Sequence, residues 1–574
     1  MTADFRNRYL SYEELTATLE HWAGTWPDLV RLESLGRTDE GRELWLLTIG
    51  PRPDDIRPAV WVDGNMHAAE LCGSSVALGI AEDMLRFHAE GTVPHNLSAA
   101  VCEALRDVLF YVMPRISPDG AERMLHECRY VRSNTRDRRP DGSRSYWRPT
   151  DLDGDGVALA MRVEDPTGEF VASAEVPDLM VLRTVDDEGP FYKLYPEGVI
   201  ENFDGASIPA PSFLSDSPID LNRNFPWSWA PDHDQPGAGE YPGSEAESRA
   251  VIEFTTAHPN IFAWLNLHTF GGVGIRPLGH QPDAKMDQKD LAIFRQVGEW
   301  LETHTGYPMV SGYEEFLYEP DKPLHGDLTD YAYHQRGCIG YVVELWDLFA
   351  QVGLERKKPF VKAYTDLDRD DMVAIARWDR EQNAGRAVLP WRGFEHPQLG
   401  AVELGGIDPR VGMWNPPYEL LPGICNQHAA AFLRVAAMAP RLRFGAVETT
   451  ALGGGLTRLD VTVENVGYLP SYVLSSAKKL SWNEELYLDV ECDGCELAEG
   501  GTRRTLGHLD GWGRGAGEGT GALYYPYGRG SSGRARRSLV VKGVGTVRLC
   551  ARSCRTGEIR SEVDIAGTDK PVPD

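Results

Sequence analysis

Short apolar runs that lie between predicted helices restrict the fold of residues 1–440 more than any other feature. Residues 108–113, 261–267 and 339–345 are predominantly apolar, and a predicted helix at residues 71–87 follows a further short strand. Strands with little polar alternation are typical of sheets that helices cover on both faces. The pattern therefore predicts an α/β fold for this part of the chain.

The balance of charge changes near residue 440. Residues 441–574 contain 18 Lys and Arg against 17 Asp and Glu, whereas residues 1–440 contain 40 against 69. In the tail, Leu459, Val461 and Val463 alternate with polar residues, which is the pattern of half-exposed strands. We therefore predict two domains, one at residues 1–440 and a small C-terminal β-sandwich at 441–574.

Residues 133–218 interrupt the alternation of strands and helices in the first domain. They are polar, rich in Pro and Gly, and show little periodicity. This composition is typical of loops, so we expect a long insertion on the surface.

The overall composition excludes several classes of protein. With 42% hydrophobic and 25% charged residues, the chain resembles neither a disordered nor a fibrous protein. The net charge of −28 argues against nucleic acid or an anionic membrane as the main partner. The first residues form no apolar segment, so the chain as it stands is expected to be cytoplasmic, or secreted if a leader was removed.

A His-x-x-Glu pair follows a predicted strand at residues 59–62. The three-residue spacing places His67 and Glu70 on one side of a helical turn, where both could bind one metal ion. With 15 His and 86 acidic residues in the chain, about one such spacing is expected by chance. A surface histidine beside a capping glutamate is the alternative explanation.

Three further segments strengthen the interpretation. Residues 220–224 are densely polar. His268 ends one apolar run, where an α/β sheet presents functional side chains, and Glu344 lies late in another, where an unpaired charge is costly. Each could be a helix cap, a core histidine or an ion-paired glutamate. Together, in this order, the four segments resemble the zinc carboxypeptidases of the carboxypeptidase A type.

The resemblance extends over about residues 8–440 and implies a mixed, mostly parallel sheet flanked by helices. It also implies that His67, Glu70 and His268 bind one catalytic Zn²⁺, with a position left open for water. Asp220 matches the acid that orients a zinc-bound histidine. Some family members carry an Arg between the first two ligands, where this chain has Ala68 and Ala69.

The resemblance assigns roles to further polar residues. Glu344 matches the general base. Arg132, which follows a Ser-Pro-Asp-Gly sequence similar to the family's Asn-Pro-Asp-Gly turn, matches the arginine that stabilises the oxyanion; Arg148 is a rival match. Asn222 and Arg223 match the pair that binds the terminal carboxylate of the substrate, the arginine through a bidentate fork.

The match to the family is looser for the residues that would contact the side chain of the substrate's C-terminal residue. Tyr318 matches the mobile tyrosine over the substrate, although Tyr313 could fill that role. Gly279 and Thr329 match the positions that contact the terminal side chain.

Since neither Gly279 nor Thr329 is acidic, the expected preference is neutral or broad rather than basic. The charged residues Asp327 and Arg276 are close in sequence to Thr329 and Gly279, and their charges would alter this preference if they reached the same pocket.

Alternating acids in the insertion suggest a second metal site. Asp151, Asp153 and Asp155, followed by Gly156, have the spacing of a loop that places oxygens around Ca²⁺. The acid expected at the twelfth position is replaced by Arg162. A plain acidic turn is the alternative.

Four cysteines of the tail, Cys492, Cys495, Cys550 and Cys554, form a Cys-x-x-Cys and a Cys-x-x-x-Cys pattern. They could bind a structural metal ion, form two local disulfides, or remain reduced.

The leading hypothesis is a zinc metallocarboxypeptidase that hydrolyses the C-terminal bond of peptides with a free C-terminus. A zinc-dependent amidase or deacylase of cell-wall peptides is the first alternative. An inactive module that binds peptide or glycan is the second, although neither a predicted ligand nor Glu344 is missing.

Overall fold

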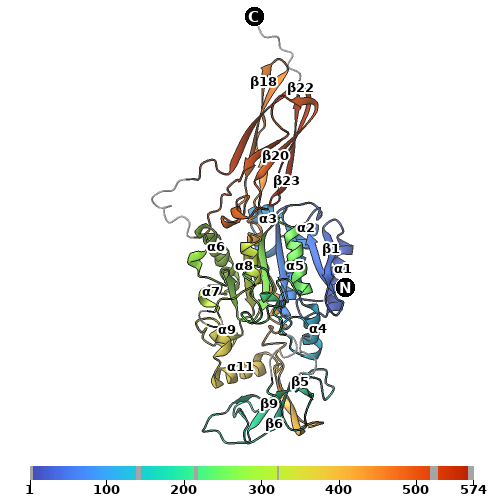
Figure 1. Cartoon of the computed structure of the whole chain (residues 1–574), viewed down its shortest axis with the longest axis vertical. Helices are drawn as coiled ribbons and strands as arrows, with labels where there is room; N and C mark the ends of the chain where they lie inside the picture. Colours follow the sequence, from blue (N-terminus) through green and yellow to red (C-terminus); the bar gives the residue numbers. More distant parts are fainter. Residues whose placement is uncertain are drawn as a thin grey trace.

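The computed structural model describes residues 4–136, 144–211, 218–317, 319, 322–516 and 528–566. Three parts follow one another along the long axis of the molecule (Figure 1). An α/β domain lies in the middle, a C-terminal sheet domain at one end, and a small antiparallel subdomain at the other. No helix among these described residues is long and apolar enough to cross a membrane.

The α/β domain is built on an eight-stranded mixed sheet with the strand order β1-β2-β4-β3-β11-β14-β12-β13. Its central neighbours β4, β3, β11 and β14 run parallel. The expected α/β fold is thus confirmed. The strands are β1 (Val30–Arg37), β2 (Glu43–Ile49), β3 (Ala59–Gly64), β4 (Leu109–Met113), β11 (Ile261–Thr269), β12 (Val273–Arg276), β13 (Met309–Ser311) and β14 (Ile339–Leu345).

Helices cover both faces of this sheet because its central strands are apolar on both sides. In β3, Val60 and Val62 belong to the core under one layer of helices, while Trp61 belongs to the core on the opposite face. The helices of the domain are α1 (Tyr12–Thr25), α2 (Cys72–Glu90), α3 (Ala99–Leu105), α4 (Pro118–Glu127), α5 (Ala246–Ala257), α6 (Gln288–Thr305), α7 (Gly312–Glu315), α8 (Leu328–His334), α9 (Leu348–Val352), α10 (Lys362–Thr365), α11 (Arg369–Gln382) and α12 (Leu421–Ala436).

The predicted insertion contains strands that its composition did not indicate. Two of its strands, β5 (Tyr146–Pro149) and β10 (Gly198–Glu201), pair with each other. The others join two strands from much later in the chain in a six-stranded antiparallel sheet. This sheet consists of β6 (Ala160–Glu164), β7 (Phe170–Ala172), β8 (Met180–Leu182), β9 (Tyr192–Pro196), β15 (Val388–His396) and β16 (Gly400–Ile407).

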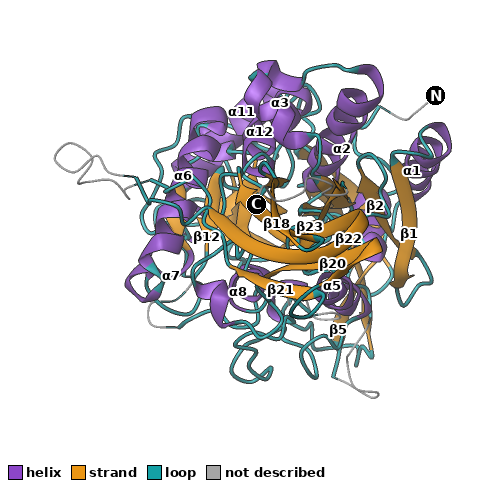
Figure 2. Ribbon diagram, turned by 90° about the horizontal axis from the view of Figure 1, so that it is seen from above, coloured by secondary structure: helices purple, strands orange, loops and turns teal. Residues whose placement is uncertain are grey.

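The tail forms a separate seven-stranded antiparallel sheet, as its alternating pattern predicted. The apolar members of that pattern, Leu459, Val461 and Val463, are buried in a core of its own. The strands are β17 (Leu442–Phe444), β18 (Glu448–Gly453), β19 (Leu456–Asn465), β20 (Leu486–Leu497), β21 (Arg503–Gly507), β22 (Arg534–Ser553) and β23 (Gly557–Ile565). Seen from above, these strands lie over the α/β domain (Figure 2).

The C-terminal domain contacts the α/β domain where the central parallel strands begin. Arg555, only 1% exposed, donates hydrogen bonds to the carbonyl oxygens of Ile261 and Arg336, and to that of Gly337 at 3.0 Å. Its guanidinium lies 4.7 Å from the ring centre of Trp482. The carboxyl ends of the parallel strands therefore point away from this domain.

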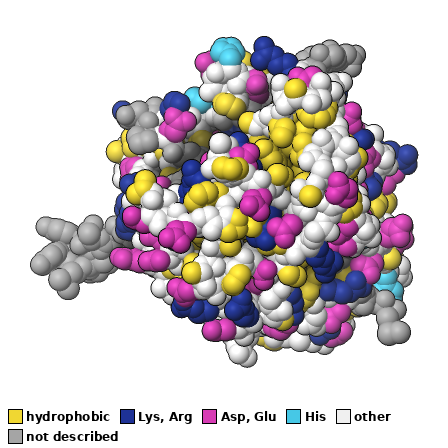
Figure 3. Space-filling model, turned by 90° about the horizontal axis from the view of Figure 1, so that it is seen from below, with side chains coloured by type: hydrophobic (Ala, Val, Ile, Leu, Met, Phe, Trp, Pro, Cys, Tyr) yellow, Lys and Arg dark blue, Asp and Glu magenta, His cyan; other side chains and the backbone are white. Residues whose placement is uncertain are grey.

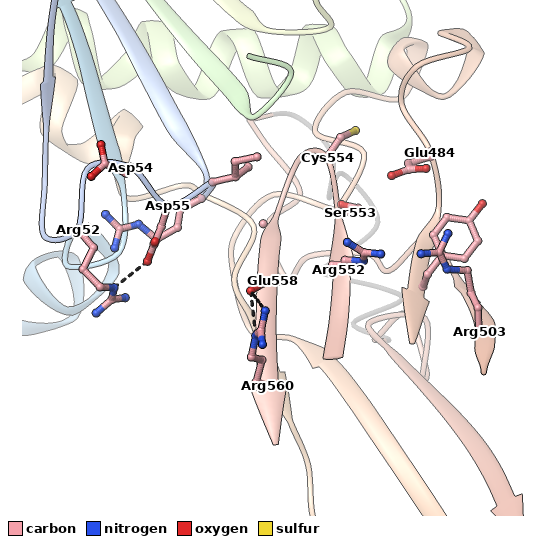
Figure 4. A pocket seen from close by; sticks show the side chains of 14 residues that line it. Arg52, Asp54, Asp55, Glu484, Arg503, Arg552, Ser553, Cys554, Glu558 and Arg560 are labelled. Carbon is pink, nitrogen blue, oxygen red and sulfur yellow. Dashed lines mark hydrogen bonds and ion pairs between the residues drawn. The ribbon is translucent and has the colours of Figure 1, made fainter. Parts of the chain in front are cut away.

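A cleft also lies between the two domains (Figure 4). The loop at residues 52–57 forms one side, and β22 and β23 form the other. Two ion pairs lie within it, Arg52 with Asp55 at 2.7 Å and Arg560 with Glu558 at 2.6 Å.

Arg555→Ala should destabilise the protein by at least about 3 kcal/mol, because several hydrogen bonds to a buried charge are lost and the carbonyl groups lose their donor. Urea unfolding followed by tryptophan fluorescence measures the change. Arg560→Ala, at an exposed guanidinium, is the control and should have little effect. Equal effects of the two substitutions would contradict this role for Arg555.

Candidate metal centre

His67 and Glu70 lie in the loop that joins β3 to α2. The loop packs closely against the helix: a Cβ atom on Gly64 would lie 2.5 Å from the carbonyl group of Gly73, so only glycine permits this approach. Asn65 turns the chain with a φ of 55° and donates its amide to the carbonyl oxygen of His67 at 2.8 Å. The local sequence thus determines where the two side chains point.

His268 and Glu344 lie at the carboxyl ends of neighbouring parallel strands. They are register partners in β11 and β14, so their side chains lie on the same face of the sheet. The loop with His67 and Glu70 begins at the same edge of the sheet, because β3 runs parallel to β11.

Three ligand atoms from these segments converge. His67 Nδ1 lies 2.8 Å from Glu70 Oε1, and His268 Nδ1 lies 2.9 Å from Glu70 Oε2. The two Nδ1 atoms are 3.1 Å apart. All three side chains are buried.

The other ring nitrogen of each histidine determines its tautomer. His67 Nε2 lies 3.0 Å from a carboxylate oxygen of Asp220, which can only accept. His268 Nε2 lies 2.6 Å from the amide oxygen of Asn266, whose nitrogen donates to Asp63. Both Nε2 atoms therefore carry the proton, and both Nδ1 atoms present lone pairs.

This arrangement places acceptors against acceptors. The two Nδ1 lone pairs and the carboxylate of Glu70 face one another, and Glu70 Oε2 has no hydrogen-bond donor. A buried group of this kind is costly unless a cation lies between its members. Two imidazoles and one carboxylate form a ligand set typical of catalytic zinc, so His67, Glu70 and His268 fit the predicted ion.

Asn266 and Asp63 support the site, although the sequence analysis did not identify them. Asp63 accepts hydrogen bonds from Trp61 at 2.6 Å and Trp264 at 2.7 Å, as well as the one from Asn266. The available signal was that Asn266 precedes His268 by two residues and therefore shares its face of the strand.

Asp220 connects the metal centre to Arg132. Besides facing His67, it accepts two hydrogen bonds from Arg132, both of 3.0 Å. Burial alone would raise the pKa of Asp220, but Arg132 and His67 hold it well below its usual value. Asp220 is therefore ionised and orients both neighbours.

The structure separates the two candidates for the oxyanion-stabilising arginine. Arg132 lines the same pocket as His67, His268 and Glu344. Arg148 instead lies on β5 of the subdomain, where it pairs with Glu201 at 2.7 Å. Of the two candidates, Arg132 is the one that lines this pocket.

Glu344 also lines the pocket. Burial, and then the negative charge of Glu70, raise its pKa well above the usual range, while Arg132 acts in the opposite direction. A cation bound at Glu70 would favour the ionised form of Glu344.

Asn222 and Arg223 belong to a short 3₁₀ helix, Leu221–Arg223. The Asn222 side-chain oxygen accepts the backbone N–H of Leu328 at 2.8 Å, and Arg223 Nη1 donates to the carbonyl oxygen of Asn222 at 2.6 Å. Both side chains line the pocket, and no carboxylate of the described residues forms an ion pair with Arg223. Its remaining donors are available to an anion.

The pocket also includes the positions expected to contact the terminal side chain. Gly279 and Thr329 line it, together with Asp327, Arg276 and Phe316. Tyr318 lies outside the described residues, and Tyr313, on α7, is not among the residues that line the pocket.

The subdomain packs beside this edge of the sheet. Ala69, between the two ligands of the His67 loop, is 1% exposed and belongs to a small core with Val157, Leu159 and Trp414 packed against it. A long side chain at this position would not fit. Figure 3 views the molecule from this end, where acidic and basic side chains are interspersed around a hollow.

The acidic loop of the insertion does bring its three aspartates together. One oxygen from each of Asp151, Asp153 and Asp155 lies within 4.8 Å of the others. The same carboxylates accept backbone N–H groups of the loop, so the turn is also closed without a cation. Glu197, which the sequence analysis missed, accepts two further N–H groups of this loop. Calcium binding stays a prediction.

The four tail cysteines do not converge. In the β20–β22 pair, Cys495 lies opposite Gly543 and Cys550 opposite Asp489, which separates the two cysteines by about 20 Å along the strands. No metal-binding group found among the described residues includes a cysteine, and all nine cysteines are free. The predicted metal site and disulfides are therefore unsupported, and the reduced state fits the structure.

Comparison with protein families identifies both parts of the chain. Residues 15–160 and 210–352, half of the chain, match the family described as zinc carboxypeptidase. Residues 441–564 match a family described as a domain of unknown function.

Among similar proteins, carboxypeptidase B of Astacus astacus is 34% identical over 112 residues, which cover 20% of this chain and 33% of that protein. A zinc carboxypeptidase of Saccharothrix mutabilis subsp. capreolus is 31% identical over 126 residues, which cover 21% of this chain and 27% of that protein. The chain thus aligns with a third or less of the length of either relative.

Among solved structures, bovine thrombin-activatable fibrinolysis inhibitor in complex with tick carboxypeptidase inhibitor matches with a TM-score of 0.42 and 15% identity, covering 75% of this chain and 98% of that chain.

His268→Ala should abolish stoichiometric zinc binding, whereas Asp220→Asn should weaken it about 10- to 100-fold, because the second change removes only the charged acceptor that orients His67. Zinc content after dialysis and competition with a chelator measure the two effects. A zinc-loaded His268→Ala protein would contradict the assignment. Unchanged affinity in Asp220→Asn would remove Asp220 from its orienting role.

Proposed function

Because the chain belongs to the zinc carboxypeptidase family, we propose that it is a metallocarboxypeptidase that hydrolyses the C-terminal bond of peptides with a free C-terminus. One observation carries the proposal. A single pocket is lined by His67 and His268 of the buried ligand set, by the carboxylate of Glu344 and by the guanidinium of Arg223.

Zinc, when bound, would supply a Lewis acid that polarises the scissile carbonyl group and acidifies water. His67, Glu70 and His268 would hold it, and Asp220 and Asn266 keep the Nδ1 lone pairs of the two histidines directed at it. The net positive charge of this ligand set with the ion makes it suited to that chemistry.

Glu344 is proposed as the general base. Its position beside His268 on the neighbouring strand places its carboxylate at the edge of the metal centre, where it can take a proton from water and pass it to the leaving amine. Burial in the pocket raises its pKa above the usual range of a carboxyl group, which makes the carboxylate a stronger base.

Arg132 is proposed to stabilise the negative charge that develops on the carbonyl oxygen. Its hydrogen bonds to Asp220 fix the guanidinium before substrate binds, so little reorganisation is required in the transition state.

Asn222 and Arg223 are proposed to bind the terminal carboxylate of the substrate. The amide oxygen of Asn222 is already occupied by Leu328 N–H, which leaves its NH₂ group as the donor. Arg223 supplies charged donors. An amidase or deacylase of cell-wall peptides would use the same metal chemistry, and this clamp distinguishes the two functions.

Glu344→Gln should retain zinc but reduce turnover at least about 100-fold, because glutamine cannot accept the proton. Metal analysis and kcat on one peptide measure both properties. Glu302→Gln, at an exposed position of α6, is the matched control and should be unaffected. Near-normal turnover of Glu344→Gln would exclude Glu344 as the base.

Amidation of the substrate's C-terminus should lower kcat/KM about 100- to 1000-fold, since charged hydrogen bonds to the carboxylate are lost. Arg223→Ala should impair cleavage of the free-acid peptide severely and of the amidated peptide much less. The measurement compares both peptides with both proteins, with Arg249→Ala, at an exposed position of α5, as control. Equal cleavage of the two peptides by the unaltered protein would favour an amidase or deacylase.

A further inference from the structure

A second group of side chains that can bind a metal ion lies outside the metal centre. It consists of His280, in the loop after β12, and of Asp330 and His334, both on α8. Their four-residue spacing places Asp330 and His334 on one face of the helix. One ligand atom from each of the three side chains lies within 4.8 Å of the others. Two separate segments thus bring two imidazoles and one carboxylate together.

The carboxylate of Asp330 is enclosed and is held by the loop that carries His280. Its side chain is 0% exposed, and its Oδ2 lies 2.5 Å from His280 Nδ1. The backbone N–H of Gly279 lies 3.1 Å and 3.3 Å from the two carboxylate oxygens, which accept from it. The carboxylate is therefore oriented before any ion binds. A cation that replaces the proton between His280 and Asp330 would meet two ligands that already face each other.

His334 adds an imidazole that the surrounding protein leaves partly unpaired. Its Nε2 is buried and has no hydrogen-bond partner among the described residues. The ring stacks on Trp227, with ring centres 4.1 Å apart, and its centre lies 5.4 Å from that of His280. Burial, and then the neighbouring His280, lower the pKa of His334 to about 3, so the ring is neutral at pH 7. A neutral imidazole is the form that binds metal ions.

A second buried carboxylate lies close to this group. Asp327, three residues before Asp330, is 6% exposed, and its Oδ2 has no hydrogen-bond partner among the residues that the structure describes. Asp330 and Asp327 both lie close enough to act electrostatically on His280. A proton on His280 supplies one positive charge to these two carboxylates, whereas a divalent cation supplies two.

We propose that His280, Asp330 and His334 bind a second zinc ion. Two imidazoles and one carboxylate form a ligand set that zinc accepts, with one position left for water. The ion joins the loop after β12 to α8. Because Gly279 and Thr329, the chain neighbours of two of these ligands, line the pocket of the metal centre, the ion fixes two parts of the pocket wall relative to each other. This role does not rest on the proposed carboxypeptidase activity.

Zinc titration tests the proposal in protein that has been dialysed and shown by metal analysis to retain only the ion of the metal centre. The side chain of His280 is 19% exposed, so its ion exchanges with solvent more readily than that of the buried metal centre, and dialysis should remove it. Calorimetry should then detect one further equivalent of zinc. The same addition should raise the melting temperature, because an ion that binds only the folded state stabilises it.

His280→Ala and His334→Gln should each lose the further equivalent and the rise in melting temperature, while they retain the ion of the metal centre. His88→Ala is the matched control. His88, like His334, lies in the last turn of its helix and has a buried Nε2 without a partner among the described residues. It belongs to no metal-binding group found in that part of the chain, so His88→Ala should bind zinc as the unaltered protein does.

Anomalous scattering at the zinc edge locates the ion in crystals of the unaltered protein soaked with zinc, even if a variant fails to fold. A peak about 2.0–2.2 Å from ligand atoms of His280, Asp330 and His334 supports the proposal. No further equivalent in the titration, an equivalent that both variants retain, or zinc found only elsewhere on the surface would overturn it. Since no readout depends on turnover, failure of the proposed function would leave this result unaffected.

Discussion

The arrangement of the site depends on three buried acceptors that face one another. His67 Nδ1, His268 Nδ1 and the carboxylate of Glu70 lie within about hydrogen-bond distance of each other, with no proton to share between them once Asp220 and Asn266 have fixed the tautomers. A bound cation satisfies all three acceptors at once. The same carboxylate of Asp220 aligns Arg132, so the requirement for a metal ion and the position of the oxyanion-stabilising group are linked through one side chain.

The parallel sheet separates this chemistry from the C-terminal domain. Arg555 joins that domain to the beginning of β11, whereas His268 and Glu344 lie at the opposite ends of β11 and β14. Accordingly, no described residue of the C-terminal domain lines the pocket. The subdomain, in contrast, packs against Ala69 in the ligand loop. Of the two additions to the α/β domain, the subdomain is the one placed to affect which molecules reach the site.

Sequence reasoning succeeded where burial determines composition. The predicted runs at 261–267 and 339–345 correspond to β11 and β14, because strands covered on both faces must be apolar. It failed for the subdomain, whose strands β6–β9 have three to five residues, too few to reveal a period, and whose partner β16 is more than 200 residues away. The strand register that separates Cys495 from Cys550 likewise cannot be deduced from the spacing of the cysteines in the sequence.

The segment that begins α8 shows a further limit of matching positions one at a time. The backbone N–H of Leu328 donates to the side-chain oxygen of Asn222, which lies more than 100 residues earlier in the sequence. Residue spacing gives no sign of this contact, yet it leaves the NH₂ group of Asn222 as the donor of the proposed clamp. A shift of this segment would disturb the orientation of Asn222, so recognition of the free C-terminus depends on where α8 begins.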